Sequence, residues 1–75
     1  MSKFTTITKG MTIADIAEGE SGYNYYGKLR TNGEWAIVRE SVAGTQYRIA
    51  VGASGYSTAW TNRGTTVTYG LPTIG

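Results

Sequence analysis

The fold of this chain is decided by residues 23–51, which read YNYYGKLRTNGEWAIVRESVAGTQYRIAV. Apolar or aromatic residues alternate with polar ones in three segments of this stretch, at about 25–30, 35–38 and 46–51. Alternation with a period of two, together with aromatic and β-branched side chains, is typical of half-buried strands. We therefore expect three consecutive antiparallel strands joined by short turns.

The first turn lies at Asn32-Gly33, and two registers fit it. A two-residue type I′ turn would place Trp35 on the face of the basic residues Lys28 and Arg30. A three-residue loop, Thr31-Asn32-Gly33, gathers the large apolar side chains on one face, with Gly33 in a left-handed conformation at a bulge. We favour this loop. It pairs Leu29 with Trp35, Gly27 with Ile37 and Arg30 with Glu34.

The second hairpin follows from the same alternation. We expect Ile37 to lie opposite Ile49, with residues 41–45 as the connecting loop. This register divides the side chains between two faces of the sheet. One face would carry Tyr25, Leu29, Trp35, Ile37, Tyr47, Ile49 and Val51, and the other Tyr26, Lys28, Arg30, Val38, Gln46 and Arg48.

Residues 1–22 differ from the rest of the chain, because they contain no Trp or Tyr. Ile13, Ile16 and Ala17 follow helical spacing, but a helix this short is marginal in water. The segment 18–22 reads as a flexible joint. We therefore expect residues 1–22 to form an extended arm that takes its shape from whatever it packs on.

The C-terminal third carries weaker signals. Residues 52–64 are rich in Gly, Ser and Thr, and we expect a long loop that Tyr56 and Trp60 pack down onto the sheet. Residues 65–71 read as a last strand. The predicted fold is all-β, a small antiparallel meander of about four strands that is barrel-like or sandwiched by oligomerisation. The predicted divisions are an N-terminal arm (1–22), a β domain (23–71) and a C-terminal tail (72–75).

The composition excludes several kinds of chemistry. The chain has 75 residues, enough for one domain, and contains no Cys and no His. It therefore lacks disulfides, a thiolate nucleophile, a cysteine-ligated metal and the usual acid or base of neutral pH. No residue is placed to activate one of its many hydroxyl groups. We expect no enzymatic activity, no catalytic residue, no metal site and no cofactor.

The small size of the chain indicates that it acts together with partners. A domain of this length buries little apolar area and has no disulfide to support it, so we expect a homo-oligomer. No apolar run approaches the roughly 18 residues of a membrane span. The start of the chain, residues 1–4, lacks the apolar core of a signal peptide. We expect no membrane association and an origin inside the cell.

One group of basic residues is a candidate site for binding nucleic acid. Small β-barrels bind single strands through a basic face with interleaved aromatic residues. The formal net charge here is only +2, whereas a nucleic-acid-binding domain shows a strong basic stripe. A solvated face or a protein interface is the stronger expectation, and a small nucleic-acid-binding β-barrel stays an alternative. The residues in question are Lys28, Arg30, Arg48 and Arg63, with Tyr26 and Trp60.

A series of short motifs runs along residues 23–70. In order they are Tyr26-Gly27-Lys28-Leu29, Asn32-Gly33-Glu34-Trp35-Ala36-Ile37-Val38-Arg39, Tyr47-Arg48, Gly52, Tyr56-Ser57-Thr58-Ala59-Trp60-Thr61-Asn62-Arg63 and Thr68-Tyr69. In this combination of turns and aromatic residues the chain resembles small β-rich virion-associated proteins of tailed bacteriophages. Such proteins are similar in size and composition to capsid decoration (cement) proteins and to small tail or neck components. The resemblance implies no cofactor and no catalytic residue.

These observations together predict a structural virion protein, made in the host cytoplasm. It would bind the major capsid protein or another virion protein on the phage head and stabilise capsomer junctions. The alternative is a tail- or fibre-associated module whose Tyr-rich loops contact a receptor. The expected partner contacts are Phe4, Ile7, Ile13 and Ile16 on the arm, and Tyr56, Trp60 and Arg63 on the body.

Overall fold

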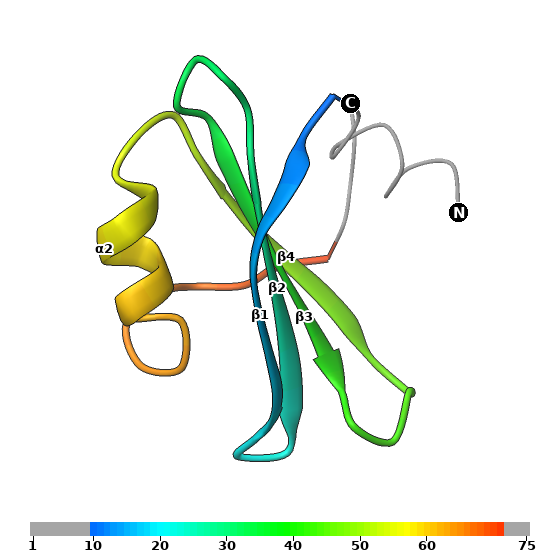
Figure 1. The fold of residues 1–75 in the computed structure, drawn as a ribbon. Helices are drawn as coiled ribbons and strands as arrows, with labels where there is room; N and C mark the ends of the chain where they lie inside the picture. The colour runs from blue at the N-terminus through cyan, green and yellow to red at the C-terminus, as the bar shows by residue number, and fades with distance from the viewer. Residues whose placement is uncertain (1–9, 72–75) are drawn as a thin grey trace.

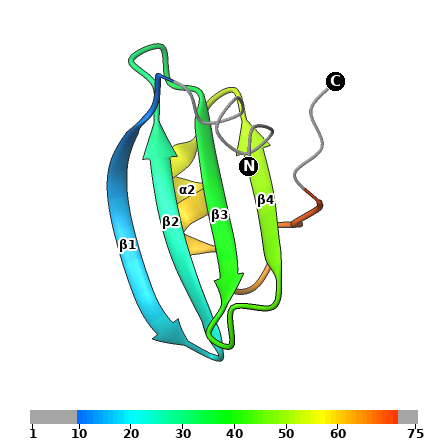
Figure 2. The same ribbon diagram turned by 90° about the vertical axis from the view of Figure 1, so that its right-hand side faces the viewer.

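The computed structural model describes residues 10–71 as an antiparallel sheet of four strands with one short helix. The strands lie in the order β1-β2-β3-β4, and helix α2 covers one face of the sheet (Figures 1 and 2). No pairing joins β1 to β4 within these residues, so the sheet is open and not a barrel. The predicted all-β antiparallel meander is confirmed. The elements are β1 (Thr12–Glu20), β2 (Tyr23–Leu29), β3 (Trp35–Ser41), β4 (Tyr47–Gly52) and α2 (Tyr56–Thr61).

The hairpin between β2 and β3 has the predicted three-residue loop. Leu29 pairs with Trp35, and the N–H of Arg30 donates to the carbonyl of Glu34 at 2.8 Å. Gly33 has a φ of 96°, a left-handed conformation that costs glycine little and other residues more. The loop, the register and the bulge at Gly33 are therefore confirmed.

The predicted register of the hairpin between β3 and β4 is wrong by one residue. Ile37 pairs with Ala50, and Val38 pairs with Ile49. The turn explains part of the difference, because the Oγ of Ser41 accepts the N–H groups of Thr45 and Gln46 at 3.0 and 3.1 Å. The N–H of Ser41 also donates to the carbonyl of Gln46 at 3.0 Å, so Ser41 and not Glu40 faces Gln46, and β3 continues one residue further than expected.

A shift of one residue exchanges the two faces of a strand. Tyr47, Ile49 and Val51 therefore lie on the face away from Trp35 and Ile37, and not beside them as predicted. The smaller residues Ala50 and Gly52 take the positions on the side of the sheet that carries α2. Packing favours this register, because the indole of Trp35 fills the space where a side chain on residue 52 would lie.

Residues 12–20, predicted to belong to an extended arm outside the β domain, are instead part of the sheet. They form β1, which pairs with β2 along its length. The helical spacing of Ile13 and Ile16 has another cause, because an irregularity between Ile13 and Asp15 puts both isoleucines on one face of the strand. The segment read as a flexible joint ends in a tight turn, in which Ser21 and Gly22 have φ values of 49° and 87°. Two consecutive positive φ values are the signature of a type I′ hairpin turn.

Residues 56–61, predicted as loop, form helix α2. Tyr56 and Trp60 are four residues apart, so they share one face of the helix, and both pack against the core below it. The last predicted strand, residues 65–71, is reduced to a single bridge between Gly70 and Ile49 at the outer edge of β4. Figure 2 shows this segment emerging beside β4 after it has passed across the sheet.

The core has two parts, one on each side of the sheet. The larger part lies under α2 and contains Tyr25, Trp35, Ile37, Ala50 and Ala59. Among residues 10–71, Ile37 is the largest side chain that is fully enclosed. The smaller part lies on the opposite side and contains Ala36, Val38 and Ile49, with Met11 and Tyr26 packed against them.

Candidate functional site

The face of the sheet away from α2, which we call the open face, is the candidate functional site. The register of the four strands sets its membership, because directly paired residues point to the same side of a sheet. Figure 2 shows this side, with α2 behind the strands. The open face carries Ile13 and Ile16 from β1, Tyr26 and Lys28 from β2, Ala36, Val38 and Glu40 from β3, and Tyr47, Ile49 and Val51 from β4.

The open face has a buried centre and an exposed apolar rim. Val38 and Ile49 at its centre are only 5% and 7% exposed. Around them, Ile13, Ile16 and Val51 are 59%, 54% and 61% exposed. Exposed apolar side chains that gather on one face of a sheet make that face a candidate interaction site.

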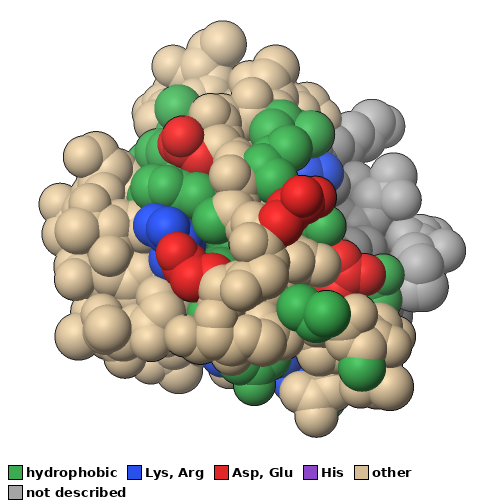
Figure 3. Space-filling view, turned by 60° about the horizontal axis from the view of Figure 1, so that its bottom comes forward, with side chains coloured by type: hydrophobic (Ala, Val, Ile, Leu, Met, Phe, Trp, Pro, Cys, Tyr) green, Lys and Arg blue, Asp and Glu red, His purple; other side chains and the backbone are tan. Residues whose placement is uncertain are grey.

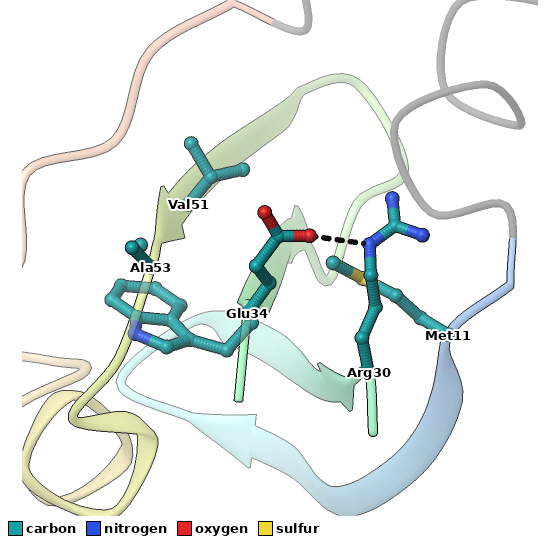
Figure 4. Close-up of a pocket in the computed structure, with 7 residues that line it drawn as sticks. Met11, Arg30, Glu34, Val51 and Ala53 are labelled. Atoms are coloured by element: carbon teal, nitrogen blue, oxygen red, sulfur yellow. Dashed lines mark ion pairs between the residues drawn. The ribbon is translucent and has the colours of Figure 1, made fainter. Parts of the chain in front are cut away.

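Two surface hollows among the described residues border the open face, one at the end of the sheet and one within the face. One, of about 310 Å³, is where β1 begins and β4 ends, and Met11 and Val51 contribute to its wall. Figure 4 shows these two side chains with the ion pair between Arg30 and Glu34, whose Nε and Oε1 atoms are 3.0 Å apart. The second hollow, of about 320 Å³, lies among Ile13, Val38 and Tyr47. The open face is therefore shaped by shallow depressions and is not flat.

Three polar side chains of the open face are joined by hydrogen bonds. The carboxylate of Glu40 accepts hydrogen bonds from the hydroxyl of Tyr47 at 2.8 Å and from that of Tyr26 at 3.1 Å. These bonds favour the ionised acid and lower the pKa of Glu40. Burial and the bond to Glu40 raise the pKa of Tyr26, and the bond to Glu40 raises that of Tyr47. Glu40 thus stays an anion, and both phenols stay neutral donors, at neutral pH.

The predicted contacts on the body lie on the other side of the sheet, around α2. Tyr56 donates from its hydroxyl to Asp15 at 2.8 Å, and Trp60 packs against the core. Arg63 forms a two-pronged ion pair with Glu20, at 3.0 and 2.8 Å, and stacks over Trp60 at 4.3 Å. All three side chains hold α2 and the following turn to the sheet. Because these side chains are engaged within the fold, little of their surface is left to contact a partner.

The two groups of predicted contacts are therefore not brought together. Ile13 and Ile16 lie on the open face, and Phe4 and Ile7 lie outside the described residues. Sequence reasoning missed Val51 and Tyr47, because the wrong register assigned both to the buried face. The sequence signal that could have found them is Gly52. The large indole of Trp35 fits better opposite this glycine than opposite Val51, as the predicted register had it.

The predicted basic face is divided by the same register. Lys28 lies on the open face, whereas Arg48 pairs with Arg39 on the face that α2 covers. Arg30 is engaged with Glu34. These positive charges do not form one stripe, so the geometry does not favour the path for a single strand of nucleic acid.

The described part of the chain shows neither a metal cluster nor a membrane-spanning helix. In residues 10–71 no three acidic side chains are grouped closely enough to hold a metal ion. No helix in the same range has the length and apolar character needed to cross a membrane. Comparison with protein-family models, curated proteins and solved structures gave no match.

Tyr69, on the side of α2, is expected to ionise late in alkaline solution. Burial is the main cause that raises the pKa of its phenol to about 12, from an ordinary value near 10. The unfolded chain releases this proton near pH 10. The contribution to stability is therefore complete below pH 10 and is lost as pH rises from 10 to 12.

Ultraviolet absorbance titration of the phenols and unfolding by urea at each pH measure this directly. The Tyr69→Phe variant should lose one late titration step and show a shallower fall in stability above pH 10. If all six tyrosines ionise together near pH 10, the burial of Tyr69 is wrong.

Proposed function

We propose that this chain is a structural binding protein that assembles through the open face. One observation supports this most strongly. A sheet face with an exposed apolar rim, including Ile13 and Val51, has no helix over it in residues 10–71. Burying such a rim releases about 25 cal/mol for each Å² of apolar surface removed from water.

The first occupant of the open face, in this proposal, is a second copy of the chain. Two sheets packed face to face lie about 10 Å apart and interdigitate their side chains, as in a β-sandwich. A twofold interface uses the same patch on both subunits, so the patch must complement itself. The open face allows such pairing, because it carries both a cation, Lys28, and an anion, Glu40, among its apolar side chains.

The larger assembly is a phage head, on which the chain acts as a decoration protein. The resemblance of residues 23–70 to small virion-associated phage proteins supports this step. Such a protein would bind the major capsid protein and stabilise the junctions between capsomers. Many symmetric copies would make modest single contacts sufficient through avidity. A tail- or fibre-associated role is the alternative, and copy number in the virion separates the two.

Light scattering of the purified chain at low and high salt tests the proposal. We expect a closed oligomer whose mass does not change with salt, because apolar burial and not charge holds it. The Ile13→Glu variant should shift the oligomer toward monomer, since it puts a charge on the rim. The matched control is Val42→Glu, because Val42 is also 59% exposed but lies in the turn between β3 and β4.

The same variants extend the test to particles. In phage particles purified from cells that make the chain, wild type and Val42→Glu should be present and Ile13→Glu depleted. A copy number close to that of the major capsid protein indicates the head, and a few copies indicate the tail. A wild-type monomer at every concentration, or no chain in the particles, would overturn the proposal.

A further inference from the structure

A surface hollow of about 350 Å³ lies on the side of the sheet that α2 covers, at the end where the β1–β2 turn lies. Its wall includes Tyr23 of β2, Arg39 of β3 and Arg63 from the turn after α2. Figure 3 brings this end of the molecule forward and shows acidic and basic side chains side by side at the surface. Tyr23, Arg39 and Arg63 do not belong to the open face.

The guanidinium of Arg39 is fixed in place by aromatic rings. Its central carbon lies 4.5 Å from the ring centre of Tyr23 and 4.7 Å from that of Tyr69. These contacts cover the guanidinium and restrict its rotation. Within residues 10–71, no hydrogen bond or ion pair engages its N–H groups. Arg39 is therefore oriented but has no acceptor within the described range.

A second arginine lies directly across the strand pair. Arg48 of β4 pairs with Arg39, and the two side chains share a face of the sheet. Like charges in directly opposite positions destabilise a sheet. Arg48 donates from its Nη1 to the carbonyl of Tyr47 at 2.8 Å, which does not neutralise its charge. The pair thus concentrates positive charge at one place.

The nearby acid does not relieve this charge. Glu20 is held by Arg63 through two hydrogen bonds, at 3.0 and 2.8 Å, and the remaining Nη1 of Arg63 donates to the carbonyl of Trp60 at 2.7 Å. Glu20 and Arg63 therefore balance each other, and no acidic side chain among residues 10–71 forms an ion pair with Arg39 or Arg48. The Glu20–Arg63 pair also shows that this hollow accommodates a carboxylate held by a guanidinium.

We propose that the hollow beside Arg39 binds carboxylate side chains of an acidic peptide segment in a protein partner. A guanidinium presents its N–H groups in a planar fork that matches a carboxylate in two-pronged geometry. Arg39 presents such a fork at the hollow, and Arg48, its partner on the neighbouring strand, adds a second positive charge, which suits a segment with more than one acidic side chain. The proposal is independent of self-association through the open face, because the two surfaces lie on opposite sides of the sheet.

NMR titration of the labelled chain at fixed ionic strength tests this site. The probe is the capped peptide acetyl-Gly-Glu-Gly-Glu-Gly-amide, and its Gln analogue is the neutral control. We expect saturable shifts of the Nε–H signal of Arg39 with the acidic peptide and none with the neutral one. Arg39→Gln should weaken binding by about tenfold, the loss of one charge-assisted pair. Arg39→Lys, which keeps the charge but loses the fork, should also bind less tightly than wild type.

Lys28→Gln is the matched control, because it removes the same charge from the opposite face. It should change the affinity by less than about twofold, as expected for a distant surface charge. Equal losses in Arg39→Gln and Lys28→Gln, both still folded by circular dichroism, would show diffuse attraction and overturn the site. Equal affinity for acetate and the peptide would overturn the peptide partner. Light scattering of the same variants reports separately on the open face.

Discussion

Gly52→Ala is expected to destabilise the fold by about 3 kcal/mol, the upper part of the usual range for overpacking. A methyl group on residue 52 would lie 2.5 Å from the Nε1 of Trp35, with two other ring atoms nearer still. The indole has little room to move, because Trp35 is 8% exposed and its Nε1 donates to the carbonyl of Ser54 at 2.6 Å. Urea unfolding measures the loss, and the indole N–H signal reports the broken hydrogen bond.

Gly70→Ala is the control for this substitution. Gly70 has no heavy atom within 4 Å of the position that a methyl group would take. An alanine that fits its backbone stabilises a protein by about 0.4–1 kcal/mol, because it restricts the unfolded chain. If Gly52→Ala proves as stable as Gly70→Ala, then the pairing of Gly52 with Trp35 is wrong.

Gly27→Ala should separate helix α2 from the sheet. A methyl group there would lie 2.9 Å from the Cζ of Tyr56 and 3.0 Å from the Cε3 of Trp60, with the Tyr56 hydroxyl nearer still. Both aromatic rings would have to move, so we expect a loss of about 2–3 kcal/mol. The indole signal of Trp60 and hydrogen exchange across α2 should change, while the β2–β3 turn should not.

A double-mutant cycle with Tyr56→Phe tests the cause. Removing the hydroxyl of Tyr56 breaks its bond to Asp15 but makes room for the new methyl group. The double variant should therefore be more stable than the sum of the two single losses predicts, by about 1 kcal/mol. Strict additivity would mean that the helix does not contact Gly27.

The hairpin between β2 and β3 was predictable because its constraints are local. The strands are joined by three residues, Asn32-Gly33 marks the turn, and only one register puts Leu29 and Trp35 together on one face. The alternation of side chains and the preference of glycine for positive φ then select the same answer. Because the turn and the alternation select the same register, contacts with distant segments are not needed to choose it.

The hairpin between β3 and β4 lacked this agreement. In either register, apolar side chains of β4 lie beside the apolar side chains of β3. One register uses Tyr47, Ile49 and Val51 for this, and the other uses residues that include Ala50. Helix α2 decides between them, because it needs small residues beneath it. The sequence pattern of residues 56–61 did not reveal that helix, so the register could not be chosen.

The candidate site was partly visible for a related reason. Ile13 and Ile16 stood out as apolar residues without aromatic neighbours, although their spacing suggested a helix. Only pairing with β2 makes them part of a sheet face that includes Val51. Arg39 gave no signal along the chain, because its stacking partners Tyr23 and Tyr69 are far from it in sequence.

The sequence by itself determined the strand-rich class, the antiparallel meander and the first hairpin, because these depend on alternation and on turns of a few residues. Tertiary structure alone decided which face of β4 is buried and that residues 12–20 join the sheet. It also decided that Arg39 and Arg48 lie opposite each other. Those outcomes depend on volume and charge balanced between segments distant in sequence, such as Gly27 under Tyr56 and Glu20 with Arg63. A one-dimensional pattern records neither the space beneath a helix nor the partner of a charge.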